Sequence, residues 1–475
     1  MSLTKIVATV GPSSERVEDL TSLIRAGVNV FRFNLKHNDH AWHSKCIENV
    51  KKAAQLMGQP VAVLLDLQGL DIRVGCLEGG KITVEKGKTI NFVKNKKFPN
   101  DILVSESFFS THIKKNQRIF INDGEIKFKV LSKKKNSVSV KVSRGGVVKS
   151  NKSINIPGAE INLPSLLSKD IKDLSLASKY EVDFLALSFV RNKKDIDLLK
   201  KYIKKFSLTA KILAKIENRD ALNNFEEILE ASDGIMVARG DLGIEIPLEE
   251  VPYYQKKIIK RCVEVGKPVI TATQMLDSMT HNIIPSRAEV SDVANAILDY
   301  TDAVMLSQET SIGSYPKETV KAMAKISHFW ENKRPLITGF NFKLNHQTAA
   351  VCYSAYNLWM SPFCRKENVK AFVVMTETGM TARMLSRLRP NLPIIALTNN
   401  DKIKDQLCLS YGVIPLILKR KANLYKQKGV SDIKIILNCV KKYGYIKKGD
   451  RIIIVYGEDW GAPGKTCIMR IQEVP

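Results

Sequence analysis

Eight short, apolar, β-branched runs recur along the first two thirds of the chain, and amphipathic stretches with helical period separate most of them. The expected strands cover residues 6–10, 28–33, 61–67, 184–189, 212–216, 235–238, 269–273 and 304–306. The expected helices include residues 14–25, 41–56, 169–179, 193–206, 248–265 and 286–298. Apolar strands that alternate with helices indicate a parallel sheet buried on both faces. Eight such units predict an α/β fold, a closed (β/α)₈ TIM barrel.

Two segments depart from this alternation. Between residues 70 and 161, short alternating strands and turn signals such as Gly145-Gly146 predict a small β-barrel lid domain, inserted after the third barrel strand. From residue 345 a second α/β pattern begins, with expected strands at 369–375, 394–397, 413–416 and 451–455. We therefore expect a barrel at 1–69 and 162–335, an inserted lid at 70–161, and a C-terminal α/β regulatory or oligomerisation domain at 345–475.

The composition excludes several classes of protein. A chain of 475 residues, 44% hydrophobic and 26% charged, is typical of a globular protein of about three domains. No apolar run approaches the ~18 residues of a membrane-spanning helix, and the strand-like start leaves no room for a signal peptide. The eight cysteines form no C-x-x-C pair, so neither a zinc site nor a disulfide framework is indicated. We expect a cytoplasmic protein with no membrane partner.

The net charge of +26 suggests an anionic partner. Residues 81–155 contain eighteen basic and five acidic residues, so half of the excess charge lies in the inserted segment. Because this segment shows no nucleic-acid module and no interleaved aromatic platform, we expect no nucleic-acid partner. A basic lid could instead steer a phosphorylated small molecule. A nucleic-acid-binding protein remains an alternative that rests on net charge alone, and a steeply salt-dependent shift of duplex DNA would support it.

Polar side chains stand at the carboxyl ends of the expected barrel strands, where active sites of this architecture lie. They include Arg32, Asn34, Asp66, Arg191, Lys215, Glu217, Arg239, Asp241, Thr273 and Glu309. Lys215 and Glu217 alternate along one strand and therefore point to the same face. Glu217 and Asp241 could both bind one Mg²⁺, and Arg32 could bind a phosphate. The set suits metal-assisted phosphoryl transfer, although an isolated Lys-x-Glu is more often a surface ion pair.

Several longer motifs resemble the pyruvate kinase family almost from end to end. They are TKIVATVGPSS at 4–14, AKIEN at 214–218, VARGDLG at 237–243, ATQMLDSM at 272–279 and PSRAEVSDVANA at 285–296. The resemblance implies glycolytic transfer of a phosphoryl group from phosphoenolpyruvate to ADP, giving pyruvate and ATP, with Mg²⁺ or Mn²⁺ as cofactor. It also implies a homotetramer.

The resemblance assigns roles by position. Lys215 would stabilise the transferred phosphoryl group and the enolate, Glu217 and Asp241 would bind Mg²⁺, and Arg32 would contact the phosphate. The Arg239-Gly240 backbone, Asp241 and the Thr273 hydroxyl would hold the substrate, with Thr273 near the face where enolpyruvate takes its proton. The nucleotide-side positions that it implies are Asn34, His37, Arg73 and Lys152. Asp123 of the lid would face the closed cleft.

The departures from the family pattern gather at one place. Family members bind K⁺ with Asn, Ser, Asp and Thr at positions 34, 36, 66 and 67, whereas this chain has Asn34, Lys36, Asp66 and Leu67. Potassium-independent relatives typically place a lysine where Asp71 stands. We hypothesise that the Lys36 ammonium replaces K⁺ and neutralises Asp66, so that a K⁺ requirement is doubtful. The alternative is that Lys36 extends to solvent and the site has decayed.

Two further expectations concern regulation. The run Thr376-Glu377-Thr378-Gly379-Met380-Thr381 resembles the loop with which many family members bind an effector phosphate, so a sugar-phosphate or nucleotide effector is a candidate; an ordinary strand–helix turn explains this run about as well. A non-catalytic regulatory paralogue is the main rival to an active enzyme. The altered K⁺ site, Gln308 and Ser153 favour the paralogue, whereas the presence of Lys215, Glu217, Asp241 and Thr273 favours the enzyme.

Overall fold

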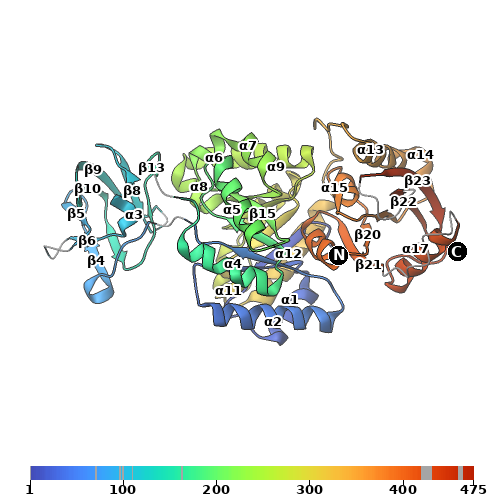
Figure 1. Cartoon of the computed structure of the whole chain (residues 1–475), viewed down its shortest axis with the longest axis horizontal. Helices are drawn as coiled ribbons and strands as arrows, with labels where there is room; N and C mark the ends of the chain where they lie inside the picture. Colours follow the sequence, from blue (N-terminus) through green and yellow to red (C-terminus); the bar gives the residue numbers. More distant parts are fainter. Residues whose placement is uncertain are drawn as a thin grey trace.

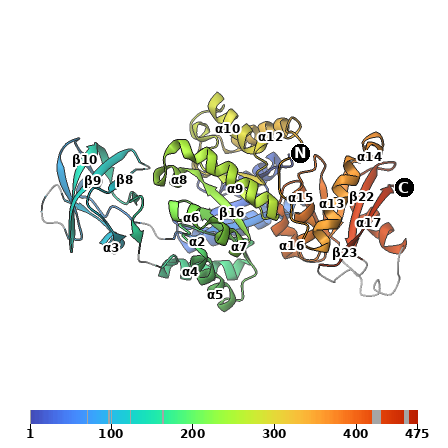
Figure 2. The ribbon, with the colours of Figure 1, turned by 90° about the horizontal axis from the view of Figure 1, so that it is seen from above.

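The chain forms three parts that lie in a row in the computed structural model (Figure 1), and a view from above shows the same order (Figure 2). A β-rich part lies at one end, a barrel in the middle, and a second α/β part at the other end. The structure describes residues 2–69, 72–95, 98, 101–109, 111–122, 124–161, 164–418, 430–457 and 464–475. Asp71 and Asp123, both singled out in the sequence, lie outside the described residues.

Eight parallel strands close into a barrel in the order β1-β18-β17-β16-β15-β14-β3-β2. Their bounds are β1 Lys5–Thr9, β2 Val30–Asn34, β3 Ala62–Asp66, β14 Phe184–Leu187, β15 Lys211–Ile216, β16 Gly234–Ala238, β17 Val269–Ala272 and β18 Ala303–Leu306. Nearly every strand residue is buried, as a sheet covered on both faces requires. The prediction of a (β/α)₈ barrel is confirmed, and each strand ends within two residues of its expected bounds.

Helices cover the outside of this barrel. They are α1 Val17–Ala26, α2 His40–Met57, α4 Ser168–Tyr180, α5 Lys193–Lys205, α6 Arg219–Asn223, α7 Phe225–Ala231, α8 Arg239–Glu245, α9 Val251–Val265, α10 Arg287–Leu298, α11 Gln308–Ser311 and α12 Pro316–Glu331. Local sequence fixes their ends: Ser286 and Glu289 form a capping box at the start of α10. The single helix expected at 248–265 is instead a 3₁₀ turn, Leu248–Glu250, followed by α9, because Pro252 suits only a first helical turn.

The segment after β3 forms a six-stranded sheet in the order β12-β8-β9-β10-β5-β6, and two two-stranded sheets. The elements are β4 Lys81–Val84, β5 Thr89–Val93, β6 Ile102–Leu103, α3 Glu106–Phe109, β7 Thr111–His112, β8 Arg118–Ile121, β9 Ile126–Lys134, β10 Ser137–Arg144, β11 Gly146–Lys149, β12 Ile154–Asn155 and β13 Glu160–Ile161. Phe92 packs edge-to-face on Phe108 and Phe128 in a core of its own. This inserted β part agrees with the expected fold class.

The C-terminal part is a five-stranded sheet in the order β21-β20-β19-β22-β23 with helices on its faces. The elements are α13 Gln347–Met360, α14 Pro362–Lys366, β19 Ala371–Met375, α15 Met380–Ser386, β20 Ile394–Thr398, α16 Asp401–Gln406, β21 Val413–Ile417, α17 Val430–Lys442, β22 Arg451–Gly457 and β23 Thr466–Glu473. The first four strands of this order are mutually parallel. The sequence analysis missed β23, which pairs antiparallel to β22 at the edge of the sheet.

The C-terminal part docks on the barrel face where the strands begin. Lys5 Nζ donates to the Val413 carbonyl at 2.6 Å, and Lys402 pairs with Asp183, just before β14, at 2.6 Å. The opposite face, where the strands end, is therefore left to the inserted part. No helix among the described residues is both long enough and apolar enough to cross a bilayer.

Candidate active site

Three charged side chains from the ends of β15 and β3, which lie on either side of β14, meet at the barrel mouth. Lys215 lies near the end of β15, Glu217 directly follows that strand, and Asp66 ends β3. The Lys215 ammonium lies 2.8 Å from Glu217 Oε1 and 3.3 Å from Asp66 Oδ1. All three residues are buried, with Lys215 only 9% exposed. Asp241, in the first turn of α8, lines the adjoining cavity between the barrel and the inserted part.

The charges in this cluster stabilise one another. Burial alone would lower the pKa of Lys215, but the nearby carboxylates of Asp66, Glu217 and Asp241 outweigh it and raise that pKa. Burial would likewise raise the pKa of Asp66, but Lys215 and Arg32 hold it below its usual range. Lys215 is therefore a cation and Asp66 an anion at neutral pH.

Arg32 binds the carboxylate oxygen of Asp66 that Lys215 does not contact. Its guanidinium contacts Asp66 Oδ2 through Nε at 2.8 Å and through a terminal nitrogen at 2.6 Å. The remaining terminal nitrogen donates to Thr9 Oγ1 at 2.9 Å. Arg32 is thus fixed at the mouth by β3 and β1, with its charge next to that of Lys215.

Ser188 is a site residue that the candidate set did not include. Its hydroxyl accepts a hydrogen bond from Lys215 Nζ at 2.8 Å and lies 2.8 Å from the Leu67 carbonyl and 3.3 Å from Asp66 Oδ1. The signal was present in the sequence, because Ser188 directly follows β14 as the other candidates follow their strands. A serine at a strand end carries no charge and therefore drew less attention.

Both oxygens of Glu217 have neighbours in the protein. Its Oε2 accepts a hydrogen bond from the Phe189 amide at 2.6 Å, while the buried Oε1 accepts no hydrogen bond of good geometry and pairs only with the Lys215 ammonium at 2.8 Å. A carboxylate oxygen that accepts no hydrogen bond can also bind a hard divalent cation that takes its other ligands from substrate oxygens and water. In the described part of the chain, no group of three or more His, Cys, Asp or Glu side chains could form an all-protein metal site.

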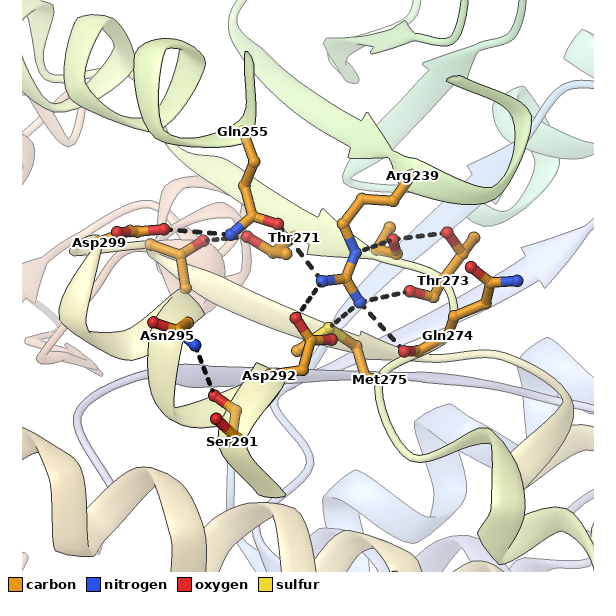
Figure 3. Close-up of polar contacts among 12 residues, drawn as sticks. Arg239, Gln255, Thr271, Thr273, Gln274, Met275, Ser291, Asp292, Asn295 and Asp299 are labelled. Carbon is orange, nitrogen blue, oxygen red and sulfur yellow. Dashed lines mark hydrogen bonds and ion pairs between the residues drawn. The ribbon is translucent and has the colours of Figure 1, made fainter. Parts of the chain in front are cut away.

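Thr273 lies in a strained turn after β17 (Figure 3). The amide of Gly240, in the first turn of α8, donates to Thr273 Oγ1 at 2.8 Å. Thr273 and Gln274 both have positive φ angles, 67° and 54°, which β-branched and long side chains rarely adopt. The Arg239 guanidinium holds this turn by donating to the Thr273 and Gln274 carbonyls at 2.7 and 3.1 Å. The Arg239 guanidinium also pairs with Asp292 at 2.7 Å, so its nitrogens are engaged by other residues of the protein.

The residues of the expected K⁺ position lie next to this cluster. Asn34 ends β2, and its side-chain oxygen accepts from the Lys36 amide at 3.2 Å. Lys36 Nζ lies 3.1 Å from Ser153 Oγ of the inserted part. Leu67 is 1% exposed and packs in the barrel core, so its side chain offers no ligand.

The expected nucleotide-side residues do not themselves line the cavity between the barrel and the inserted part, but His37, Arg73 and Lys152 each adjoin a lining residue in the sequence, namely Lys36, Ile72 and Ser153. His37 follows β2, and its carbonyl accepts a hydrogen bond from the ring of His43 at 2.8 Å. Arg73 and Lys152 belong to the inserted part, where Arg73 donates to the Asn151 carbonyl at 2.9 Å. The cavity itself is lined by Lys36, Ser153, Arg191, Asp241 and Glu245, among others.

The candidate effector loop lies in the C-terminal part, away from the barrel mouth. Gly379 has a φ angle of 79° and precedes α15, and the Arg383 side chain donates to the Thr378 carbonyl at 3.2 Å. Thr376 and Thr381 are both buried, and the Thr381 hydroxyl hydrogen-bonds to that of Thr466 at 2.8 Å. The hydroxyl groups of Thr376 and Thr381 therefore lie on buried residues of this loop.

A (β/α)₈ barrel with clustered cations and carboxylates at its strand ends defines a class of enzyme that acts on anionic substrates. Family models describe residues 1–320 as "Pyruvate kinase, barrel domain" and residues 351–472 as "Pyruvate kinase, alpha/beta domain". The chain belongs to the pyruvate kinase family, and is a kinase by that membership.

Pyruvate kinases from other organisms are similar to this chain over nearly its whole length. The pyruvate kinase of Clostridium acetobutylicum is 39% identical over 489 residues, covering 100% of both chains. The pyruvate kinase of Geobacillus stearothermophilus is 39% identical over 484 residues, covering 99% of this chain and 80% of that protein. The pyruvate kinase of Thermococcus litoralis is 37% identical over 491 residues, covering 99% and 98%.

Proposed function

We propose that this protein transfers the phosphoryl group of phosphoenolpyruvate to ADP, giving pyruvate and ATP in glycolysis. The phosphorus–oxygen bond of the substrate breaks as a terminal oxygen of ADP attacks phosphorus, and the enolate of pyruvate takes a proton at its methylene carbon. The observation that carries the proposal is the buried contact of Lys215 with Glu217 and Asp66 at the barrel mouth. Family membership supports the same reaction.

Lys215 and Arg32 supply the positive charge for this reaction. Their fixed cations can stabilise negative charge as it moves from the phosphoryl group to the enolate oxygen. The raised pKa of Lys215 keeps it protonated throughout the neutral range, so it acts by charge and not as a base. Because Asp66 and Ser188 already hold the ammonium in place, little reorganisation is needed during transfer.

Glu217 and Asp241 are the residues that would hold Mg²⁺ or Mn²⁺. Glu217 Oε1 supports this assignment, because it accepts no hydrogen bond of good geometry and pairs only with the Lys215 ammonium. Such a cation supplies charge neutralisation and orients phosphate and enolate oxygens. The Arg239-Gly240 backbone and the Thr273 hydroxyl would bind the carboxylate end of the substrate, placing Thr273 near the carbon that is protonated. Asn34, His37, Arg73 and Lys152 would contact the nucleotide.

Turnover separates an active enzyme from a non-catalytic paralogue. ATP formation from phosphoenolpyruvate, ADP and Mg²⁺ is expected for the wild type. Lys215→Met should reduce kcat by at least ~10³-fold, because it removes the cation that stabilises the transferring group. Lys211→Met, at the half-buried start of the same strand, should keep wild-type kcat, because Lys211 pairs with Asp233 and not with the residues of the barrel mouth. Wild-type protein that binds both substrates without turnover would make the regulatory paralogue the better reading.

Potassium independence is part of the proposal. Lys36 and Leu67 replace two oxygen ligands, and Asp66 already pairs with two cations of the protein. In Tris or choline buffer, the wild type should turn over without K⁺, whereas Lys36→Ser with Leu67→Thr should make kcat rise at least ~10-fold on K⁺ addition. A wild-type enzyme that needs K⁺ would contradict this part alone and leave the reaction untouched.

The wider setting of the reaction follows from the family and the sequence. We assign the protein to the cytoplasm, since all eight cysteines are free, and to a homotetramer as is usual in the family. The domain boundaries remain those expected from the sequence. Thr376, Thr378, Gly379 and Thr381 are assigned to an effector phosphate, of a sugar phosphate or a nucleotide.

A further inference from the structure

The outward face of the six-stranded sheet carries a row of three cations. The antiparallel register places Arg118 of β8 opposite Lys129 of β9, and Lys129 opposite Lys141 of β10. All three residues are exposed, whereas the alternating residues of the same strands fill the core of the inserted part. Because neighbouring strands lie about 4.8 Å apart, three positive charges stand side by side at regular spacing.

A second row lies beside the first. Phe120 is opposite Lys127, which in turn is opposite Arg144. The Lys127 ammonium lies 5.7 Å from the centre of the half-buried Phe120 ring. This row therefore adds a cation and an aromatic ring on the same face. We refer to Arg118, Phe120, Lys127, Lys129 and Lys141 as the basic face.

Folding does not explain the first row. Like charges directly opposite each other on a sheet destabilise it, and the described residues supply no ion-pair partner to Arg118, Lys129 or Lys141. A polyanion bound along the row would remove this repulsion and release its own counterions. The inserted part lies at the end of the molecule away from the C-terminal part (Figure 1), and Arg118, Lys129 and Lys141 are exposed among the described residues.

We propose that the basic face binds single-stranded nucleic acid. A uniform row of cations matches a polymer of uniform negative charge, and an aromatic ring among cations offers a base a stacking surface. A membrane fits less well, because the large apolar side chains that the described inserted part exposes, Phe98 and Val147, lie outside β8, β9 and β10. The sequence predicted no nucleic-acid partner because the segment shows neither a nucleic-acid module nor an aromatic platform. The register addresses the second ground alone, since it places one aromatic ring, Phe120, among the cations.

Fluorescence anisotropy with a labelled 20-nucleotide oligouridylate tests the proposal on the full-length protein. The wild type should bind with an affinity that falls steeply between 50 and 200 mM salt. The triple variant R118E/K129E/K141E should bind at least ~10-fold more weakly, and its slope against log salt should fall by about 2, since each phosphate contact contributes about 0.7. Lys129→Gln, at the middle of the row, should weaken binding ~3-fold and serves if the triple variant does not fold.

The matched control is K317E/K321E/K325E on α12. It reverses three exposed lysines that also follow one another on one face, so its change in net charge is identical. Its affinity for the oligonucleotide should stay within ~2-fold of the wild type. An equal loss in both triple variants, no binding by the wild type, or binding to vesicles of anionic lipid without binding to the oligonucleotide would each overturn the proposal.

Discussion

At the scale of single residues, the position of the Lys215 ammonium depends on a neutral hydroxyl. Ser188 accepts from Lys215 and lies within hydrogen-bond distance of the Leu67 carbonyl and Asp66. Its neighbourhood is where the chain departs from the family pattern, since Leu67 offers no side-chain oxygen. Ser188 therefore links the Lys215 ammonium to the backbone of Leu67, directly after β3.

We predict that Ser188→Ala lowers kcat about 10- to 100-fold with little change in KM for ADP. A hydrogen bond to a charged group contributes about 1.5–3 kcal/mol, and here it orients the ammonium more than it binds nucleotide. Steady-state kinetics measure both constants. Ser188→Thr keeps the hydroxyl and should recover most of kcat, while Ser175→Ala on the exposed side of α4 should change nothing. Equal kcat for the alanine and threonine variants would contradict the prediction.

At the scale of elements, the turn after β17 is a strained backbone held by one side chain. Arg239 donates to the carbonyls of Thr273 and Gln274 and pairs with Asp292 of α10. These bonds offset the strain of two consecutive positive φ angles. The Gly240 amide donates a hydrogen bond to the Thr273 hydroxyl. By holding the turn, the Arg239 side chain therefore fixes both of the groups proposed to bind the substrate carboxylate.

We predict that Arg239→Lys reduces kcat/KM for phosphoenolpyruvate about 10²-fold. A lysine has no planar fork and cannot reach two carbonyls and a carboxylate together, so the turn relaxes and Thr273 moves away from its position. Competition by a carboxylate-bearing substrate analogue should weaken in parallel. Asn295→Ala on α10, the helix that carries Asp292, is the control, because the Asn295 side chain donates to the Ser291 carbonyl of its own helix and not to the turn. Wild-type kinetics for Arg239→Lys would show that the hydrogen bonds from Arg239 to the turn are dispensable.

A feature could be predicted from the sequence where it depends on neighbouring residues in the chain. The barrel strands were predictable because a buried strand needs only a short apolar run. The positions of Lys215, Glu217 and Asp241 were predictable because charged residues are conspicuous directly after such runs. The turn at Thr273 was not predictable, since its positive φ angles are held by Arg239, which starts α8 after the neighbouring strand β16. The strand β23 alternates weakly and depends on pairing with β22. The place of Ser188 at a strand end was visible in the sequence, whereas its contacts with Lys215 and Asp66 are visible only in the structure.

At the scale of the whole molecule, the barrel face where the strands end and the face where they begin contact different parts of the chain. Strand ends and the inserted part form the candidate active site, and strand beginnings bind the C-terminal part. On that second face Arg389, which follows α15, pairs with Asp302 at 2.7 Å and donates to the Tyr300 carbonyl at 2.9 Å. The Tyr411 amide donates to the other oxygen of Asp302 at 3.0 Å. One buried ion pair thus joins two parts of the molecule.

We predict that Arg389→Met lowers the free energy of unfolding by about 3–5 kcal/mol, because it leaves the buried Asp302 carboxylate without its cation. Asp302→Asn combined with Arg389→Met should cost less, since no charge then stays unpaired. Arg451→Met breaks a half-exposed pair with Glu367 and should cost about 0–1 kcal/mol. Urea unfolding measures all three, and kcat at 25 °C should hold in each because the barrel mouth lies at the other face. Similar losses for Arg389→Met and Arg451→Met would mean that the buried pair does not join the two parts.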